Sequence, residues 1–391
     1  MNNKNILLVS PSFNPLDGVG WGSTQRTNLL FEACTQLGHV DVISFVDGVE
    51  SNRDDCTVLY SESAPKANMK EGRAIKFIRM LTPLNPYAMF PKNKRCAEIV
   101  RGFVKQGNYD FIVCRYIPEA MMCGLFDYAD KLVIDVDDSP CDVERTAERT
   151  SRTWRNRMYH RYRTTIIEKV VDRIQRACYF TFYANPSQAT YKNSAYLPNI
   201  PFYEYDLPLV EYAKTNPRLL FVGNMSYGPN AQGIDKFIDS VFFLIRQQIP
   251  NVELHLVGGC NQQAYLDKWS KMDGVRYMGF VDDLKQEYEE ARVVVAPIYD
   301  GAGTNIKVLE AMKMKRPCVT TTFGFRGFSK DLHHGVELLV SQDDKEFAAN
   351  VIVVLTHEAV NHEMSEKAYK VVSDRFSRSA FYEIVVNCLT K

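Results

Sequence analysis

The chain has 391 residues, of which 46% are hydrophobic and 24% are charged. This length and balance suit two folded domains with separate cores, and they exclude a chain that is disordered as a whole. Lysine plus arginine and aspartate plus glutamate both number 47, so the net charge of zero gives no indication of nucleic acid as a partner.

The ten cysteines include no Cys-x-x-Cys pair, and most lie in apolar surroundings. This pattern predicts buried thiols in a reducing cytosol. The first apolar run, residues 6–10, ends at Pro11, and no apolar run is long enough for a signal peptide or a membrane span. We therefore expect a cytoplasmic protein.

The first half of the chain alternates between strand and helix. Residues 6–10 predict a strand, 24–37 a helix closed by Gly38, and 40–46 a second strand, which together make a βαβ unit. Further buried strands are expected at 111–114, 131–134 and 179–182. A proline-punctuated stretch around 203–216 then indicates a linker.

The second half repeats this pattern. Strands are expected at 218–222, 252–257, 275–280, 293–297 and 317–321, and helices at 230–248, 283–291 and 304–314. The alternation predicts a second doubly wound sheet. We expect an α/β chain with one Rossmann-like domain over residues 1–205 and another over 206–376.

The most informative segment is the turn Gly301-Ala302-Gly303-Thr304-Asn305, which leads into a helix that carries Lys307 and Glu310. The turn follows a buried strand, so the helix begins where open α/β sheets bind ligands. Free backbone N–H groups and the helix dipole favour an anion there, and glycine lets a diphosphate approach the main chain. Lys307 adds a full charge, and Glu310 can accept hydrogen bonds from a ribose diol. The segment predicts a site for a nucleoside diphosphate.

Residues 296–324 resemble the nucleotide-sugar site of the retaining glycosyltransferases of family 4, in particular an exopolysaccharide and capsule branch with this Gly-Ala-Gly-Thr type of motif. Weaker matches at 197–199, 219–224, 252–258 and 275–282 extend the resemblance over nearly the whole chain. It implies the GT-B fold, in which two doubly wound Rossmann-like domains face each other across a cleft. The first would be the acceptor-side domain, the second would bind the nucleotide-sugar, and the final helix, 377–391, would pack back on the first.

The resemblance also implies an activity. A metal-independent glycosyltransferase would move a sugar from a nucleotide-diphosphate donor to an acceptor hydroxyl of a bacterial-type glycan (exopolysaccharide, capsule or lipopolysaccharide), often lipid-linked, at the inner face of the membrane. No cofactor and no metal is expected. Lys307 and the N–H groups near Gly303 would offset the charge on the leaving diphosphate. The expected donor contacts are Gly20, Gly22 and Ser23 in the loop after the first strand, and Gly223, Asn224, Gly303, Thr304, Asn305, Lys307 and Glu310 in the second domain.

Two departures from the family pattern leave other functions open. Many members have a glutamate that contacts the donor sugar where this chain has Ala302, so the identity of the sugar cannot be carried over. Many also have an arginine and a lysine where this chain has Asn224 and Asn230. The alternatives are a GT-B nucleotide-sugar epimerase and a catalytically silent subunit for glycan assembly.

The stretch from Gly18 to Ser23 also invites comparison with a dinucleotide-binding fingerprint. Seven residues separate its glycines from the first strand, whereas the fingerprint follows a strand directly, which argues against nicotinamide or flavin binding. A plain surface loop is the other alternative to a donor-binding loop.

Two further candidates for catalysis follow strands of the first domain. Asp138 is expected to contact an acceptor hydroxyl, with helix capping or a divalent cation held by Asp135 to Asp138 as alternatives. Arg115 lies near the position where family members often place a histidine that contacts the donor sugar. It is expected to stabilise phosphate charge or to orient the acceptor, with a surface ion pair as the alternative.

Residues 149–163 contain six arginines and no acidic residue, while apolar or aromatic residues recur every fourth position from Trp154 to Val170. The pattern predicts an amphipathic helix over 149–176 with one strongly basic face. This helix either packs on the first domain with a solvated basic face, or contacts anionic lipid or a lipid-linked pyrophosphate acceptor. No recognised nucleic-acid-binding motif accompanies it.

Overall fold

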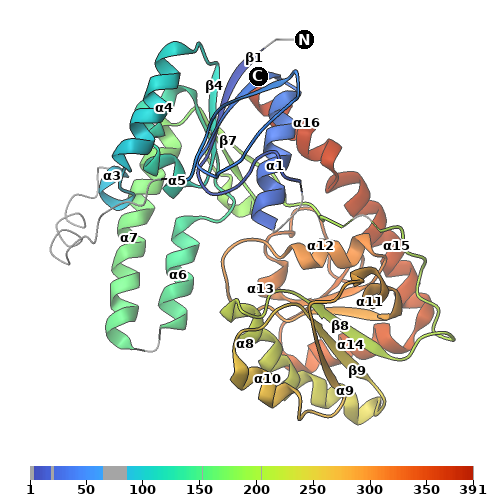
Figure 1. Cartoon of the computed structure of the whole chain (residues 1–391). Coiled ribbons are helices and arrows are strands. Elements are labelled where there is room, and N and C mark those ends of the chain that lie inside the picture. The colour runs from blue at the N-terminus through green and yellow to red at the C-terminus, as the bar shows by residue number, and fades with distance from the viewer. Residues whose placement is uncertain (1–3, 19–21, 65–85, 152, 204, 391) are drawn as a thin grey trace. The chain divides into compact units, whose positions relative to one another are not determined.

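The computed structural model describes residues 4–18, 22–64, 86–151, 153–203 and 205–390. These residues belong to two compact units, one formed by 1–198 with 378–391 and the other by 199–377 (Figure 1).

The first unit is built on a parallel sheet in which the described residues form seven strands in the order β3-β2-β1-β4-β5-β6-β7. The strands are β1 Lys4–Ser10, β2 Gly38–Ser44, β3 Cys56–Ser61, β4 Phe111–Arg115, β5 Leu132–Asp135, β6 Phe180–Tyr183 and β7 Ser194–Tyr196. Every side chain of β4 and β5 is buried, as in a sheet with helices on both faces.

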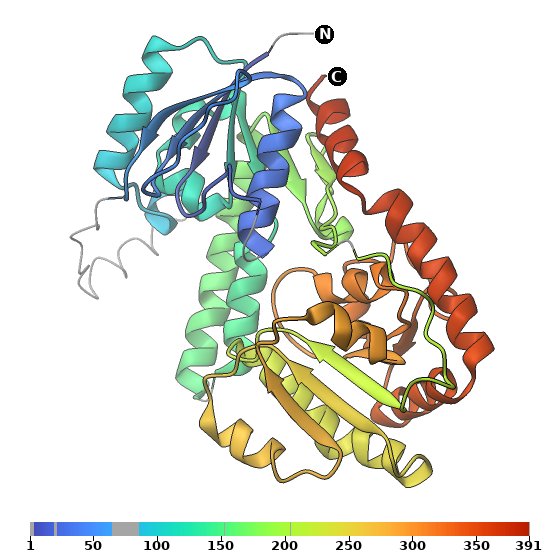
Figure 2. The same cartoon turned by 45° about the vertical axis from the view of Figure 1, so that its right-hand side comes forward.

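Helices cover both faces of this sheet. Figures 1 and 2 show α1 and α16 side by side on one face, with α4 and α5 on the other. The helices of the unit are α1 Gly22–Thr35, α3 Pro86–Met89, α4 Lys94–Gln106, α5 Ile117–Met122, α6 Pro140–Thr150, α7 Trp154–Ala177 and α16 Arg378–Leu389, with short 3-10 helices at Leu125–Lys131 and Pro186–Gln188. The predicted final helix is therefore present, and it belongs to the first unit.

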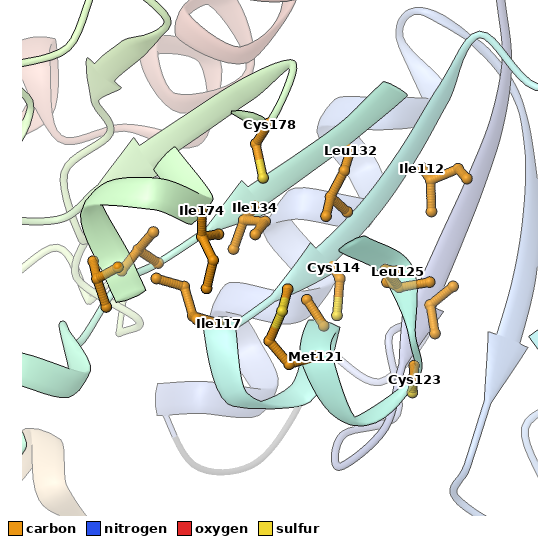
Figure 3. Close-up of a cluster of buried hydrophobic side chains, with 14 of the residues drawn as sticks. Ile112, Cys114, Ile117, Met121, Cys123, Leu125, Leu132, Ile134, Ile174 and Cys178 are labelled. Atoms are coloured by element: carbon orange, nitrogen blue, oxygen red, sulfur yellow. The ribbon is translucent and has the colours of Figure 1, made fainter. Parts of the chain in front are cut away.

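The core on the second of these faces is a cluster of aliphatic and thiol side chains from β4, β5, α5 and the end of α7 (Figure 3). Burial raises the pKa of the Cys114 and Cys123 thiols well above the ordinary value. Eight of the ten cysteines are buried, and Cys260 and Cys388 are half-buried. The prediction of buried thiols is thus confirmed for eight of them.

The predicted helix over 149–176 is wrong at its start, because two helices meet there. Helix α6 ends at Thr150 and α7 begins at Trp154. The Thr153 hydroxyl accepts a hydrogen bond from the backbone N–H of Asn156 at 3.3 Å, which caps α7 and stabilises the break. The two helices lie side by side and extend away from the sheet (Figures 1 and 2).

The second unit has a smaller parallel sheet, in which the described residues form six strands in the order β10-β9-β8-β11-β12-β13. The strands are β8 Arg218–Val222, β9 Glu253–Val257, β10 Val275–Gly279, β11 Val293–Ala296, β12 Cys318–Thr321 and β13 Leu339–Ser341. The helices are α8 Gly228–Phe237, α9 Phe243–Gln248, α10 Gln263–Trp269, α11 Leu284–Glu290, α12 Ile306–Lys313, α13 Thr322–Phe325, α14 Asp344–Thr356 and α15 Glu358–Arg375. A π-helical turn, Ile238–Phe242, joins α8 to α9.

The proline-punctuated linker lies on the second unit, whose first residue is Asn199 and not the predicted residue 206. Leu207 and Val210 are buried, and the Val210 carbonyl accepts a hydrogen bond from His362 at 2.7 Å. Arg316 donates to the Pro208 carbonyl at 2.9 Å. These contacts tie the segment to the second unit, so the boundary precedes it.

Arg316 organises this part of the second unit from inside. Its side chain is 1% exposed, and its guanidinium donates to the carbonyl oxygens of Tyr288 at 2.6 Å and Glu289 at 3.1 Å as well as to Pro208. Burial lowers its pKa to about 10. Five donors in a fixed fork thus satisfy carbonyls from three separate segments.

We expect Arg316→Met to lower the free energy of unfolding by about 2–4 kcal/mol, because it leaves several buried carbonyls without a donor. Urea unfolding followed by tryptophan fluorescence, to which buried Trp269 contributes, measures the change. The matched control is Arg276→Met, whose side chain is 60% exposed and which should shift the midpoint little. Equal midpoints for the two variants would contradict this role.

Candidate functional site

The two central strands of the second sheet are β8 and β11. From β8 the chain continues to β9 and β10 on one side of the sheet, and from β11 it continues to β12 and β13 on the other side. Ligands of open α/β sheets bind at the carboxyl ends of strands at such a switch point. Gly223 directly follows β8, and the turn that begins at Gly301 follows β11 a few residues on. The predicted donor residues therefore lie at the position that the topology favours.

The turn after β11 has a backbone that only glycine adopts readily. Gly301 has a φ of 127° and Gly303 a φ of 77°. The Arg326 guanidinium donates to both of their carbonyls, at 3.0 and 2.7 Å. Because C=O and N–H point in opposite directions across a trans peptide, this holds the following N–H groups away from Arg326.

These N–H groups are available to a ligand. Within the part of the chain that the structure describes, the backbone N–H groups of residues 302–305 donate to no acceptor. No side chain caps the N-terminus of α12 at Asn305. Free donors, an uncapped helix and a nearby cation together make an anion-binding turn.

Lys307, in the first turn of α12, supplies that cation beside β8. Its ammonium donates to the Asn230 side-chain carbonyl at 2.7 Å and lies 4.9 Å from the centre of the Phe221 ring. A Cβ added to Gly223 would lie 3.2 Å from Nζ, so glycine leaves room for the lysine. Burial lowers the pKa of Lys307 to about 8.

Glu310, one turn further along α12, is 8% exposed, and no described residue donates a hydrogen bond to its carboxylate. Burial raises its pKa to about 7, and Lys307 opposes this rise. The buried Tyr288 hydroxyl, whose pKa is raised by burial and then by Glu310, also has no partner in the described part of the chain. Among the described residues the Glu310 oxygens are not fully buried atoms that lack a partner, so solvent reaches them, and a ligand with hydrogen-bond donors would replace that solvent.

The remaining predicted residues of this unit shape the site. The Thr304 hydroxyl accepts from the buried Asn199 side chain at 2.7 Å, and the Asn305 amide donates to the Gly324 carbonyl at 3.4 Å. Asn224 is engaged in its own turn, because its side chain accepts from the N–H of Ser226 at 2.9 Å. These side chains position the loop.

A second polar cluster lies at the carboxyl edge of the first sheet, next to its own switch point between β1 and β4. Arg26 is 1% exposed and binds both oxygens of Asp135, at 2.8 and 2.7 Å, and it also donates to the carbonyls of Leu197 and Pro198. The Nε of Arg115 lies 3.2 Å from one oxygen of the same carboxylate. One buried carboxylate thus holds two arginines.

Arg115 is a buried residue, at 3% exposed, so the alternative of a surface ion pair is wrong. Its guanidinium donates to the Ser23 carbonyl, to the Thr27 hydroxyl at 2.9 Å and to Asp137 at 2.6 Å. These partners orient the guanidinium within the cluster, while its Nε has no hydrogen-bond partner among the described residues.

Tyr116 and Asp137 follow β4 and β5 with φ angles of 60° and 48°, a strained backbone for residues other than glycine. Their side chains approach each other to 3.4 Å, and the Tyr116 hydroxyl lies 3.3 Å from that of Ser23. Strained polar residues at strand ends often belong to functional sites. Ser23 belongs to the same cluster, because its carbonyl accepts from Arg115 and its hydroxyl lies close to that of Tyr116.

Asp138 is half-buried beside this cluster, where burial and then repulsion by Asp137 raise its pKa to about 7. The helix-capping alternative is wrong, because Ser139 caps α6 by accepting from Cys141 N–H at 3.3 Å. In the described residues no group of three acidic, histidine or cysteine side chains is arranged to hold a metal. Asp135 is paired with arginines instead.

The structure thus places the predicted residues in two groups. Gly223, Gly303, Thr304, Asn305, Lys307 and Glu310 meet in the second unit, with Asn224 in the adjoining turn, and Ser23, Arg115 and Asp138 meet in the first. Gly22 begins α1, and Gly20 lies outside the described residues. Sequence reasoning missed Arg26 and Arg326, which act through backbone carbonyls that no motif marks.

Residues 216–357 match the family model described as Glycosyl transferases group 1. The chain is 22% identical over 198 residues to an uncharacterized 44.6 kDa protein in the cps region of Klebsiella pneumoniae. The match covers 49% of this chain and about half the length of that relative, 50%.

Solved structures resemble nearly the whole chain at low identity. Sucrose-phosphate synthase from Thermosynechococcus elongatus is 17% identical with a TM-score of 0.67, and the match covers 98% of both chains. Anabaena HepE, solved with UDP and glucose, is 16% identical with a TM-score of 0.64 over 99% of this chain and 100% of its own. WaaG, a glycosyltransferase involved in lipopolysaccharide biosynthesis, is 15% identical with a TM-score of 0.57 over 98% and 99%.

The predicted α/β architecture of two doubly wound, Rossmann-like domains is confirmed by the sheets and by these similarities. None of the helices described here is both long and apolar enough to cross a membrane. The second unit matches the glycosyl transferases group 1 family over residues 216–357.

Proposed function

We propose that this chain is a retaining glycosyltransferase of family 4 that moves a sugar, of the hexose class, from a nucleoside-diphosphate donor to an acceptor hydroxyl. Two features of the same segment carry the proposal. The N–H groups of residues 302–305 have no acceptor among the described residues, and the largely buried Glu310 on the helix that follows receives no hydrogen bond from them. The first suits a diphosphate and the second a ribose diol. HepE was solved with UDP-glucose as well as with UDP, which supports a nucleotide-sugar as the donor class.

In this proposal the second unit stabilises the leaving group by electrostatics. Lys307 and the N–H groups of the turn face the charge that builds on the departing diphosphate. Glu310 orients the donor by accepting from the ribose hydroxyls. The site supplies its positive charge from a lysine and a helix N-terminus, so we propose that the reaction needs no metal.

The acceptor is proposed to meet the cluster of the first unit. Asp138 and Tyr116 offer groups that bind a sugar hydroxyl, while Arg115 keeps Asp137 and Ser23 in place. Gly20, Gly22 and Ser23 stay candidates for donor contact. The similarity to a protein of the cps region supports a growing glycan, in exopolysaccharide, capsule or lipopolysaccharide synthesis, as the acceptor class, and a lipid-linked glycan would be met at the inner face of the membrane.

The test of donor binding is a thermal-shift screen against UDP, GDP, ADP and common nucleotide-sugars. One nucleotide should raise the melting temperature, because a ligand that binds only the folded protein stabilises it. Glu310→Gln should abolish or strongly reduce the shift, since the amide accepts from a diol less well than a carboxylate. No shift with any nucleotide would contradict the proposal, and a shift without transfer to any acceptor would favour the silent subunit.

For turnover, we expect Lys307→Met to reduce sugar transfer by about 100-fold or more, because one preorganised donor to a developing anion contributes that much to a rate. The assay is run with EDTA present, and transfer by the wild type should persist. The matched control is Lys313→Met on the same helix, whose ammonium donates to Ser373 at 3.4 Å. Equal transfer by the two variants would remove Lys307 from the mechanism.

The pKa of Lys307, lowered to about 8, predicts how nucleotide affinity depends on pH. A bound diphosphate favours the protonated lysine, so binding above pH 8 requires proton uptake, and the affinity should fall by up to tenfold per pH unit. Below pH 8 Lys307 is already charged, and this cause of pH dependence disappears. Titration calorimetry at pH 7, 8 and 9 in two buffers of different ionisation enthalpy measures both effects.

The control for this pH dependence is Lys307→Met, which should bind more weakly at pH 7 and show no linked proton uptake at pH 9. An identical uptake in wild type and variant would mean that another group titrates.

A further inference from the structure

The first half of α7 exposes large side chains that a folded protein usually covers. Trp154 is 70% exposed, Met158 55%, Tyr162 48% and Tyr159 44%. At about 100° per residue these four side chains share one arc of roughly 140° on the helix. Further along the same stripe Ile166 is 5% exposed, so the apolar face leaves the core of the first unit as the helix extends away from the sheet.

Three basic side chains on this half of α7 lie near carboxylates of α6. Glu144 accepts from His160 and lies 2.8 Å from Arg163, and Glu148 lies 3.6 Å from Arg161. His160 and Arg163 lie outside the arc of exposed side chains, whereas Arg161 is 72% exposed and lies about 20° from Trp154 on the helix.

Two arginines on this half of α7 lack such partners. Arg155 lies within the arc of exposed side chains, and Arg157 lies about 60° outside the Trp154 edge of that arc. Within the described chain no carboxylate lies within ion-pair distance of Arg155 or Arg157. Arg155 lies 5.7 Å from the centre of the Trp154 ring, and Arg157 donates to the Ser151 carbonyl at 3.0 Å. The surface therefore combines an aromatic stripe with unpaired positive charge.

We propose that this surface, residues 154–162 of α7, docks on an anionic lipid surface. Aromatic rings with a polar edge prefer the boundary between water and lipid, and each nearby arginine is attracted to anionic head groups. A second copy of the chain could cover the stripe, but it would place arginine against arginine. An anionic bilayer matches both the apolar and the charged part of the surface, and this proposal does not depend on the transfer chemistry.

Co-flotation with vesicles tests the proposal on the full chain without donor or acceptor. The protein should float with phosphatidylcholine vesicles that contain phosphatidylglycerol, not with phosphatidylcholine alone, and salt should weaken binding. The double variant Arg155→Gln, Arg157→Gln should bind about 30-fold more weakly and depend less on salt. Trp154→Ser with Met158→Ser should also bind more weakly, but with the salt dependence of the wild type.

Matched controls come from the second unit. Phe243 is 59% exposed on α9, and the Arg276 side chain is 60% exposed, so Phe243→Ser and Arg276→Gln should bind vesicles like the wild type. Circular dichroism and the melting temperature should be unchanged in every variant, because all these side chains are exposed. Equal loss in the control variants would overturn the proposed surface.

Tryptophan fluorescence locates the contact. Anionic vesicles should shift the emission to the blue, and brominated lipid should quench it, because Trp154 enters the head-group region. The measurement is made with Trp21 replaced by Phe, because the chain has three tryptophans. In that background Trp154→Phe should keep binding and lose the signal, whereas the fully buried Trp269 stays silent. Failure of the wild type to bind anionic vesicles overturns the proposal, and so does a dimer that Trp154→Ser disperses while vesicle binding persists.

Discussion

The candidate site of the second unit depends on Glu310, a largely buried carboxylate to which no described residue donates a hydrogen bond. The rise in the pKa of Glu310 from 4.5 to about 7 means that the folded protein disfavours the charged carboxylate, relative to the neutral acid, by roughly 3 kcal/mol. Folding alone gives no return for this cost, because an apolar residue at the same position would remove it. A ligand that donates hydrogen bonds would restore the charged form, so the position makes physical sense as part of a binding site. Burial likewise disfavours the charged form of Lys307, three residues earlier, and a bound anion would restore it.

In the first unit, by contrast, the buried charged groups are paired with groups of opposite charge. Asp135 receives Arg26 through two hydrogen bonds and lies against Arg115, so the charges at the strand ends compensate one another. Removing one member of such a buried group would leave the others unpaired and would destabilise this part of the unit. This group adjoins the strained pair Tyr116 and Asp137, with Ser23 beside them. Near its switch point the first sheet thus has a cluster of paired charges, whereas the second sheet has a turn whose backbone N–H groups lack acceptors in the described residues.

The sequence was sufficient where local pattern and tertiary structure agree. The central strands, the turn at Gly301 and the helix with Lys307 and Glu310 follow from apolar runs and glycine, and the structure has them at nearly the predicted bounds. The short strands β7 and β13 were missed, because three residues at a sheet edge carry too little pattern. The single helix over 149–176 was wrong because Thr153 competes as a cap, a local choice that periodicity does not reveal. Burial of Arg115 depends on three distant partners, which no linear motif encodes.

The composition of the anion site determines how its charge must be supplied. Asn224 and Asn230 occupy the positions where the resemblance leads one to expect cations, and Asn230 instead accepts a hydrogen bond from Lys307. Arg326 is close, but its guanidinium donates to the carbonyls of the turn. A diphosphate at this site would therefore rely on one ammonium and on backbone N–H groups whose direction the glycines and Arg326 fix. Charge supplied by backbone cannot be replaced by a nearby side chain, so the geometry of the turn, more than the number of basic residues around it, would set the affinity for the donor.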